Sequence, residues 1–106
     1  MFVAIYRWRV HPELQDAFVA AWSHITSLYR ERYDSGGSSL FRDRDGTFVG
    51  IARWQNRAAR ERAFAAGPMD PARSAIMRAA TIEMLPDMEL DLVDDQWVFP
   101  MPPASS

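Results

Sequence analysis

The sequence contains no cysteine and has only two histidines among its 106 residues. The absence of cysteine excludes a disulfide framework and thiolate chemistry, and it fits a reducing compartment. The chain does not open on a basic segment followed by an apolar one, and no apolar run reaches the length of a membrane span. We therefore expect a cytoplasmic protein that has no membrane as a partner.

An excess of basic charge is also missing, since 12 basic residues stand against 14 acidic ones. Nucleic acid is therefore not predicted as a partner. A chain of this length predicts one domain, which we place at residues 1–99, followed by a proline-rich tail at 100–106. Four Trp, six Phe and three Tyr are a heavy apolar load for one small core. A second subunit is expected to cover part of it.

Residues that usually bind metals or act as nucleophiles are sparse. His11 precedes a proline at a strand–helix junction, and His24 lies off the apolar stripe of the first predicted helix, so both are interpreted as surface histidines. No serine lies in a nucleophile elbow, and Gly36-Gly37 lacks the context of a phosphate-binding loop. The sequence therefore predicts neither a metal site nor a cofactor.

Strand and helix periodicities alternate along the first half of the chain. Residues 2–10 alternate as a strand does, and apolar residues then recur at the helical period after Pro12. Two short strands are predicted at about 39–44 and 47–54. They flank an Asp-Gly pair, which is typical of a hairpin turn.

The second half of the chain repeats this helix-then-strand order. Asn56 can cap a helix that Gly67 and its following proline interrupt. The helix restarts at Asp70 and is predicted to run to about Met84, with Pro86 as its stop. A last strand is carried by alternating Met88, Leu90 and Leu92. The order β-α-β-β-α-β predicts an α+β, ferredoxin-like fold, with helices on one face of an antiparallel sheet.

The first and third predicted strands are apolar on both faces. Val3, Ile5, Val49 and Ile51 lie on the face opposite the larger apolar residues of these strands. The helices cover one face, and the simplest cover for the other is a second copy of the chain. We therefore expect a homodimer, with the alternative that these four residues are exposed aliphatics.

Small residues stand between two aromatic ones on the third predicted strand. Phe48, Gly50, Ala52 and Trp54 share a face, so that space opens between the two rings. Covered by helices, this space becomes an apolar pocket for a small molecule. The alternative is plain packing, in which Gly50 lets a large neighbouring residue come close.

Polar groups for such a pocket come from other elements. Tyr6 and Tyr29, with Trp8, could place polar atoms at its rim. Arg78, in the last helix, could supply fixed positive charge to a developing oxyanion, with a solvated surface arginine as the alternative. Glu83 falls near the apolar side of the same predicted helix.

Four segments together resemble the antibiotic biosynthesis monooxygenase superfamily: FVAIYRWRVHPELQDAFVAAW, DGTFVGIARW, RAARERAF and DPARSAIMRAA. The resemblance covers residues 2 to about 98, and the order and spacing of the segments carry it. It implies the dimeric αβ barrel, in which two ferredoxin-like sheets pack face to face. That arrangement agrees with the two-sided sheet predicted above.

The resemblance also implies a chemistry and a set of site residues. Well-understood members are cofactor-free monooxygenases that oxidise phenolic polyketides to quinones between sheet and helices. It places Trp54, Phe64 and Arg78 at pocket positions of the family. The quinone-forming members have an asparagine where this chain has Gly50, and a tyrosine where it has Arg60. The haem-degrading branch needs a histidine in the second helical region, and residues 56–85 contain none.

Three functions follow as hypotheses. The first is a monooxygenase in which Arg78 and Trp54 act in catalysis, while a small aromatic substrate is bound by Tyr6, Tyr29, Phe48, Gly50 and Phe64. The second is a non-catalytic, small-molecule-binding or stress-associated dimer with the same pocket. The third is a haem-binding protein, which would need one of the two histidines to swing inward. A titratable base in the pocket distinguishes the first from the second.

Overall fold

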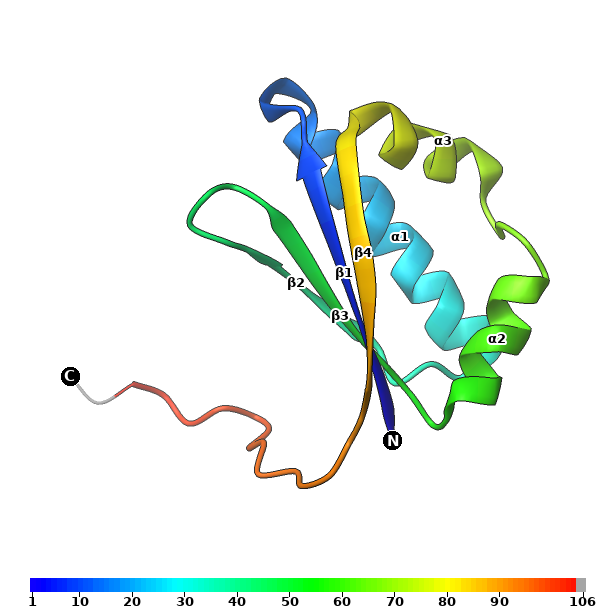
Figure 1. Cartoon of the computed structure of the whole chain (residues 1–106), viewed down its shortest axis with the longest axis vertical. Coiled ribbons are helices and arrows are strands. Elements are labelled where there is room, and N and C mark those ends of the chain that lie inside the picture. The colour runs from blue at the N-terminus through cyan, green and yellow to red at the C-terminus, as the bar shows by residue number, and fades with distance from the viewer. Residues whose placement is uncertain (105–106) are drawn as a thin grey trace.

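A four-stranded antiparallel sheet carries helices on one face in the computed structural model, which describes residues 1–104 (Figure 1). The strand order is β2-β3-β1-β4, and the α+β, ferredoxin-like fold predicted from the sequence is confirmed. The elements are β1 (Phe2–Val10), a 3-10 turn (Pro12–Leu14), α1 (Gln15–Tyr33), β2 (Ser38–Arg42), β3 (Phe48–Trp54), α2 (Arg57–Ala65), α3 (Pro71–Ala80) and β4 (Thr81–Asp91).

Local signals in the sequence set most of the helix ends. The side chain of Asn56 accepts a hydrogen bond from the backbone N–H of Ala59 at 2.9 Å, and Asp70 accepts one from Arg73 at 3.0 Å. Each bond satisfies a backbone donor that the first turn of a helix leaves free. Asp34 ends α1 in the left-handed conformation, at φ 52°.

The prediction that the last helix runs to Met84 and stops at Pro86 is wrong. The helix α3 ends at Ala80, and β4 begins at the next residue. Pro86 lies inside this edge strand, where the pairing register with β1 shifts between Ile5 and Arg7. A proline is tolerated there because a bulge on an edge strand needs no donor from it.

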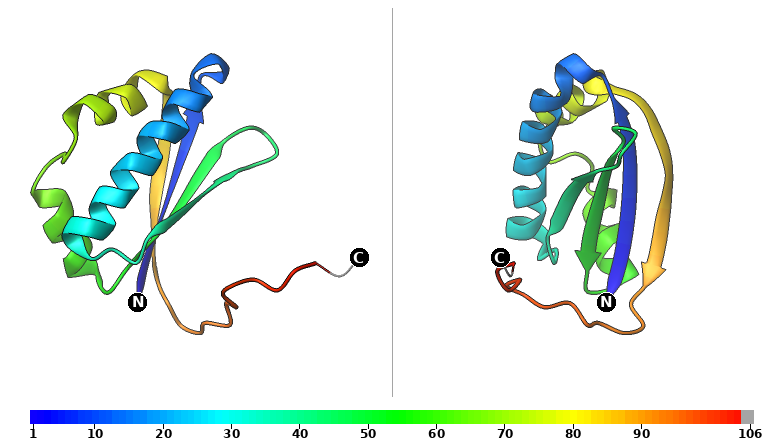
Figure 2. Two further views of the ribbon diagram at one scale, coloured as in Figure 1. Left: turned by 180° about the vertical axis from the view of Figure 1, so that it is seen from behind. Right: turned by 90° about the vertical axis from the view of Figure 1, so that its left-hand side faces the viewer.

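The core lies between the sheet and the helices. Alternate residues of β1 (Phe2, Ala4, Trp8, Val10) are buried beneath the helices, as the alternation predicts. Two clusters form this core, one around Phe18 of α1 and one around Trp54 at the end of β3. Side views show the helices together on one side of the sheet and the other side free of helices (Figure 2).

The open face of the sheet carries apolar side chains on all four strands. Ile5 pairs with Ile51 and with Met88, and these side chains share that face. Met88 is 44% exposed, and Phe41 of β2, paired with Val49, is 46% exposed. Within one copy of residues 1–104, therefore, apolar side chains of all four strands face away from the helices, with Arg7 beside Val49 among them.

The segment after β4 leaves the domain without regular structure. Residues 92–104 form neither helix nor strand, and in Figure 1 they run away from the helices. The predicted tail also includes residues 105–106, which lie outside the described residues. Among residues 1–104, every helix is too short or too polar to cross a membrane.

Candidate functional site

A cavity of about 580 Å³ lies between the sheet and the helices. Its walls come from all three helices and from every strand, and most of the residues that line it are apolar. Cavities of this size and character usually bind small molecules. It lies on the face of the sheet that the sequence assigned to a pocket.

Four aromatic side chains surround one end of the cavity. The ring of Tyr29 lies 5.9 Å from Trp54 and 5.7 Å from Phe64, between ring centroids. Trp54 and Phe64 meet edge to face at 6.2 Å, and Tyr6 lies 6.4 Å from Phe64. We call these four residues the aromatic box. Edge-to-face and tilted rings at such distances attract one another, so the box holds its shape.

The structure places Gly50 at the cavity and Phe48 in the core. A Cβ atom on Gly50 would stand 3.0 Å from the Trp8 ring, so the glycine serves close packing by a large neighbour, the alternative stated above. Gly50 still lines the cavity, whereas Phe48 does not. Phe48 instead packs against Phe18 at 5.4 Å, in the core cluster that also contains Trp8. The Trp8 ring thus fills the space that was expected between the two aromatic residues of β3.

Arg78 supplies positive charge to the cavity. It lies in the last turn of α3 and lines the cavity together with Met77 and Trp54. Within residues 1–104 its guanidinium makes neither an ion pair nor a hydrogen bond, and the residue is exposed. An unpaired guanidinium at the cavity wall can bind an anionic oxygen of a ligand.

The two tyrosines of the aromatic box are not available as bases at neutral pH. Burial raises the pKa of Tyr6, against a lowering by its hydrogen bond from Arg60, and burial likewise raises the pKa of Tyr29. Both hydroxyls therefore stay protonated at neutral pH and act as hydrogen-bond donors. The carboxylate of Glu83, also at the cavity, lies 3.6 Å from Arg9 in an exposed ion pair.

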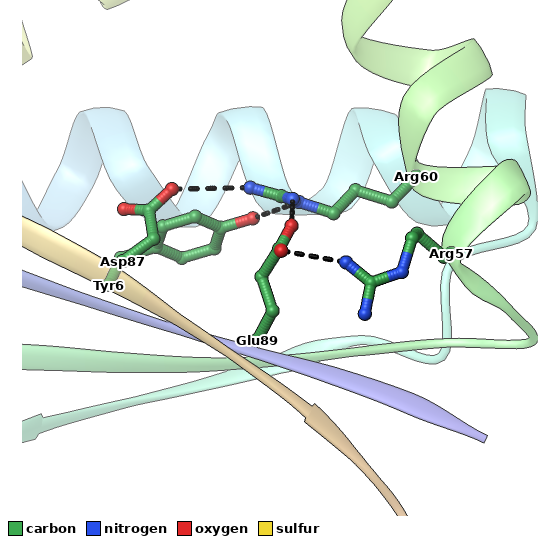
Figure 3. A network of polar contacts seen from close by, with 5 residues as sticks. All are labelled: Tyr6, Arg57, Arg60, Asp87 and Glu89. Carbon is green, nitrogen blue, oxygen red and sulfur yellow. Dashed lines mark hydrogen bonds and ion pairs between the residues drawn. The ribbon is translucent and has the colours of Figure 1, made fainter.

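A charged network behind Tyr6 was not predicted from the sequence (Figure 3). Arg60 of α2 donates through Nε to the Tyr6 hydroxyl at 2.9 Å, and its two terminal nitrogens reach Glu89 at 2.6 Å and Asp87 at 3.2 Å. Arg57 binds the other oxygen of Glu89 at 2.7 Å. The only sequence signal was that Arg60 stands where the resemblance expects a tyrosine.

Two lining residues, Trp22 and Ile25, had a clear signal that was not carried over to the predicted pocket. They recur with Tyr29 on α1 at helical spacing. Residues on one face of neighbouring elements meet at one cavity.

The histidines lie away from the cavity. His11 stands 3.9 Å from Glu13, and the Nε2 atom of His24 is 3.6 Å from a carboxylate oxygen of Asp70. Neither lines the cavity, which a haem ligand would have to do. No cluster of three metal-binding side chains occurs within residues 1–104.

Similar folds are found among solved structures, although no family profile and no curated protein matches the sequence. Rv0793 from Mycobacterium tuberculosis is 18% identical, with a TM-score of 0.72, over 91% of this chain and 98% of that one. An antibiotic biosynthesis monooxygenase is 21% identical, with a TM-score of 0.71, over 89% and 100%. SnoaB, a cofactor-independent oxygenase from Streptomyces nogalater, is 20% identical, with a TM-score of 0.73, over 90% and 95%.

The strand order and the one-sided helices define a ferredoxin-like domain with a ligand-sized cavity between its layers. More narrowly, the chain has the fold of the antibiotic biosynthesis monooxygenases, which it matches over nearly the whole length of both chains. The resemblance predicted from four sequence segments is confirmed at the level of the fold.

Proposed function

We propose that the chain is a cofactor-independent monooxygenase that oxidises a small phenolic aromatic to a quinone. The observation that carries the proposal is the cavity itself, where an aromatic box and an unpaired Arg78 face one space of about 580 Å³. The fold of SnoaB, a cofactor-independent oxygenase, supports it. Because fold alone does not determine function, the assignment depends on the cavity and its test.

The cavity groups suggest how the reaction proceeds. The substrate binds as its phenolate, and the guanidinium of Arg78 stabilises the negative charge on its oxygen. Trp54 and Phe64 hold the aromatic ring in place. The electron-rich phenolate passes an electron to dioxygen, and the two radicals combine to form a peroxide on the ring. The peroxide takes up a proton from solvent and loses water, which leaves the quinone. One oxygen atom enters the ring and the other leaves as water.

Oxygen consumption with a panel of polycyclic phenols tests this proposal. With a metal chelator present, we expect one equivalent of dioxygen to be consumed for each quinone formed.

Arg78→Ala should weaken the binding of an anionic aromatic by about 1.5–3 kcal/mol, the scale for a hydrogen bond to a charged group. Arg78→Lys should restore part of this loss, because an ammonium lacks the planar fork. Equal binding by all three proteins would remove Arg78 from the site.

A specific observation favours a second function, the non-catalytic binding of the same class of ligand. The cavity holds no free base within residues 1–104, because Tyr6 and Tyr29 have raised pKa values and Glu83 is paired with Arg9. Gly50 and Arg60 also replace two residues of the quinone-forming members. Tight binding of polycyclic phenols without any oxygen consumption would establish this second function.

The open face of the sheet supports a homodimer. Apolar side chains of β1, β3 and β4 share this face, and Met88 and Phe41 are about half exposed in one copy. Exposed apolar surfaces of this extent usually lie in interfaces. We propose that a second copy covers this face with its own, leaving the two cavities on the outer, helix-covered sides.

A further inference from the structure

The hydroxyl of Tyr6 is held in one orientation by the partly buried guanidinium of Arg60. The Nε–H of Arg60 donates to the Tyr6 oxygen at 2.9 Å, and the Arg60 side chain is only 11% exposed. The Arg60 guanidinium also stacks over the Phe64 ring at 4.8 Å. Glu89 and Asp87 fix its remaining nitrogens, so Arg60 has little freedom to turn away.

This contact determines what the Tyr6 hydroxyl can do. A guanidinium is only a donor, so the Tyr6 oxygen accepts and its own proton is left to be donated elsewhere. No acceptor for that proton is found within residues 1–104, and the Tyr6 side chain lines the cavity. A ligand in the cavity is therefore the natural partner of the Tyr6 proton.

We propose that Tyr6, positioned by Arg60, donates a hydrogen bond to an acceptor oxygen of the ligand, and so selects oxygenated aromatics over hydrocarbons. The inference rests on the proposed function of the cavity and adds a specificity-determining residue to it. Arg60 is the positioning residue, because it touches Tyr6 and the Phe64 ring but does not line the cavity.

The position of Tyr6 adds a constraint on the ligand. Arg78 lies near the junction of α3 and β4, where Thr81 pairs with Val10, four residues further along β1 than Tyr6. Four residues of a strand span roughly 13 Å. The two polar groups therefore stand apart, with apolar walls between them. A fused-ring ligand with oxygen atoms at both ends fits this arrangement.

The Tyr6→Phe variant tests the donor, with naphthoquinone and naphthalene as probes. Naphthoquinone only accepts hydrogen bonds, and naphthalene has the same rings without oxygen. Quenching of tryptophan fluorescence reports the binding of both. We expect Tyr6→Phe to weaken naphthoquinone binding about five- to tenfold, the usual effect of one lost hydrogen bond, and to leave naphthalene within roughly twofold.

The Arg60→Met and Arg57→Met variants test the positioning. Both arginines bind Glu89, but only Arg60 reaches Tyr6, so Arg57→Met is the matched control. Arg60→Met should lower the preference for naphthoquinone over naphthalene, while Arg57→Met should leave it unchanged. Arg60→Met should also raise the pKa of Tyr6 further, since the lost hydrogen bond lowers it, as tyrosinate absorbance would show.

The outcomes separate this inference from the function on which it rests. Equal weakening of both probes by Tyr6→Phe would mean that Tyr6 acts through shape alone; the inference would be wrong and the cavity would stand. If neither probe quenches the unmodified protein, the cavity is not a binding site for aromatics, and both proposals fail. A lost preference in Tyr6→Phe and Arg60→Met alone supports the inference.

Discussion

Trp54 combines an apolar ring with a buried donor that has no partner. The residue is 3% exposed, and its indole nitrogen has no hydrogen-bond acceptor within residues 1–104. An unpaired buried donor contributes nothing to stability and costs its desolvation. The ring itself therefore accounts for the contribution of Trp54 to the fold.

Substitutions at Trp54 should separate the contribution of the ring from that of the unpaired indole N–H. Trp54→Ala should lower the free energy of unfolding by about 3–5 kcal/mol, as large-to-small changes in a core do. Trp54→Phe should cost much less, because it keeps an aromatic ring and removes the unpaired N–H. Urea unfolding of the two variants measures the difference. Equal losses would contradict the conclusion that the ring accounts for the contribution of Trp54.

Tyr6 should make the protein sensitive to alkali. Its pKa lies above the ordinary value of 10.0 mainly because of burial, so folding favours the neutral hydroxyl. That contribution is complete below pH 10.0 and is lost as the pH rises through the folded-state pKa. Urea midpoints should therefore fall more steeply above this pH for the unmodified protein than for Tyr6→Phe. Parallel curves for the two proteins would contradict the raised pKa.

At the scale of the element, local signals predicted the starts of the helices better than their ends. Asn56 caps α2 through a hydrogen bond of 2.9 Å, and this position was read directly from the sequence. We expect Asn56→Ala to lower the free energy of unfolding by about 1 kcal/mol, with Asn56→Asp close to the unmodified protein. Chemical denaturation of the pair measures it. An Asn56→Asp variant as unstable as Asn56→Ala would show that the cap does not matter here.

The boundary between α3 and β4 could not be predicted from local patterns. Ile82 and Met84 continue an apolar pattern that suits a helix as well as a strand, and Pro86 is an obvious stop for either. What decides the matter is pairing with β1, in which Val10 meets Thr81 and Trp8 meets Met84. Such pairing joins residues far apart in the sequence, and a local pattern does not contain it.

The residues of the site could likewise be predicted where local patterns place them, and not where contacts between distant residues do. Strand alternation, helical spacing and the family resemblance together selected the four residues of the aromatic box. The structure brings all four to one cavity. The bond between Arg60 and Tyr6 joins residues 54 positions apart, and no spacing rule connects them. Phe48 was misplaced because alternation gives the face of a side chain and not which neighbour fills the space above it.

At the scale of the whole molecule, the open sheet face should govern assembly. We expect a dimer at micromolar concentration in sedimentation velocity, and a monomer for Phe41→Arg or Met88→Arg, because a buried charge without a partner is costly. Both residues are nearly half exposed in one copy, so the fold should tolerate the changes. Ile76→Arg, at a residue of α3 that is 43% exposed, is the control and should remain dimeric. A monomeric unmodified protein would contradict the proposed interface.

The attachment of α3 has a consequence for the timing of binding. At one end α3 passes into β4 without a loop, and the Ala80 carbonyl accepts a hydrogen bond from the His11 N–H at 2.8 Å. At the other end it follows residues 66–70, where Gly67 has a φ of 81° and a carboxylate oxygen of Asp70 lies 3.6 Å from Nε2 of His24 in α1. The end of α3 that leads into β4 is thus fixed by the sheet, and its start is joined to α2 by a short segment. We expect ligands to enter past the start of α3, so changes at Gly67 or His24 should alter association and dissociation rates together and leave the equilibrium affinity unchanged, as stopped-flow fluorescence would measure.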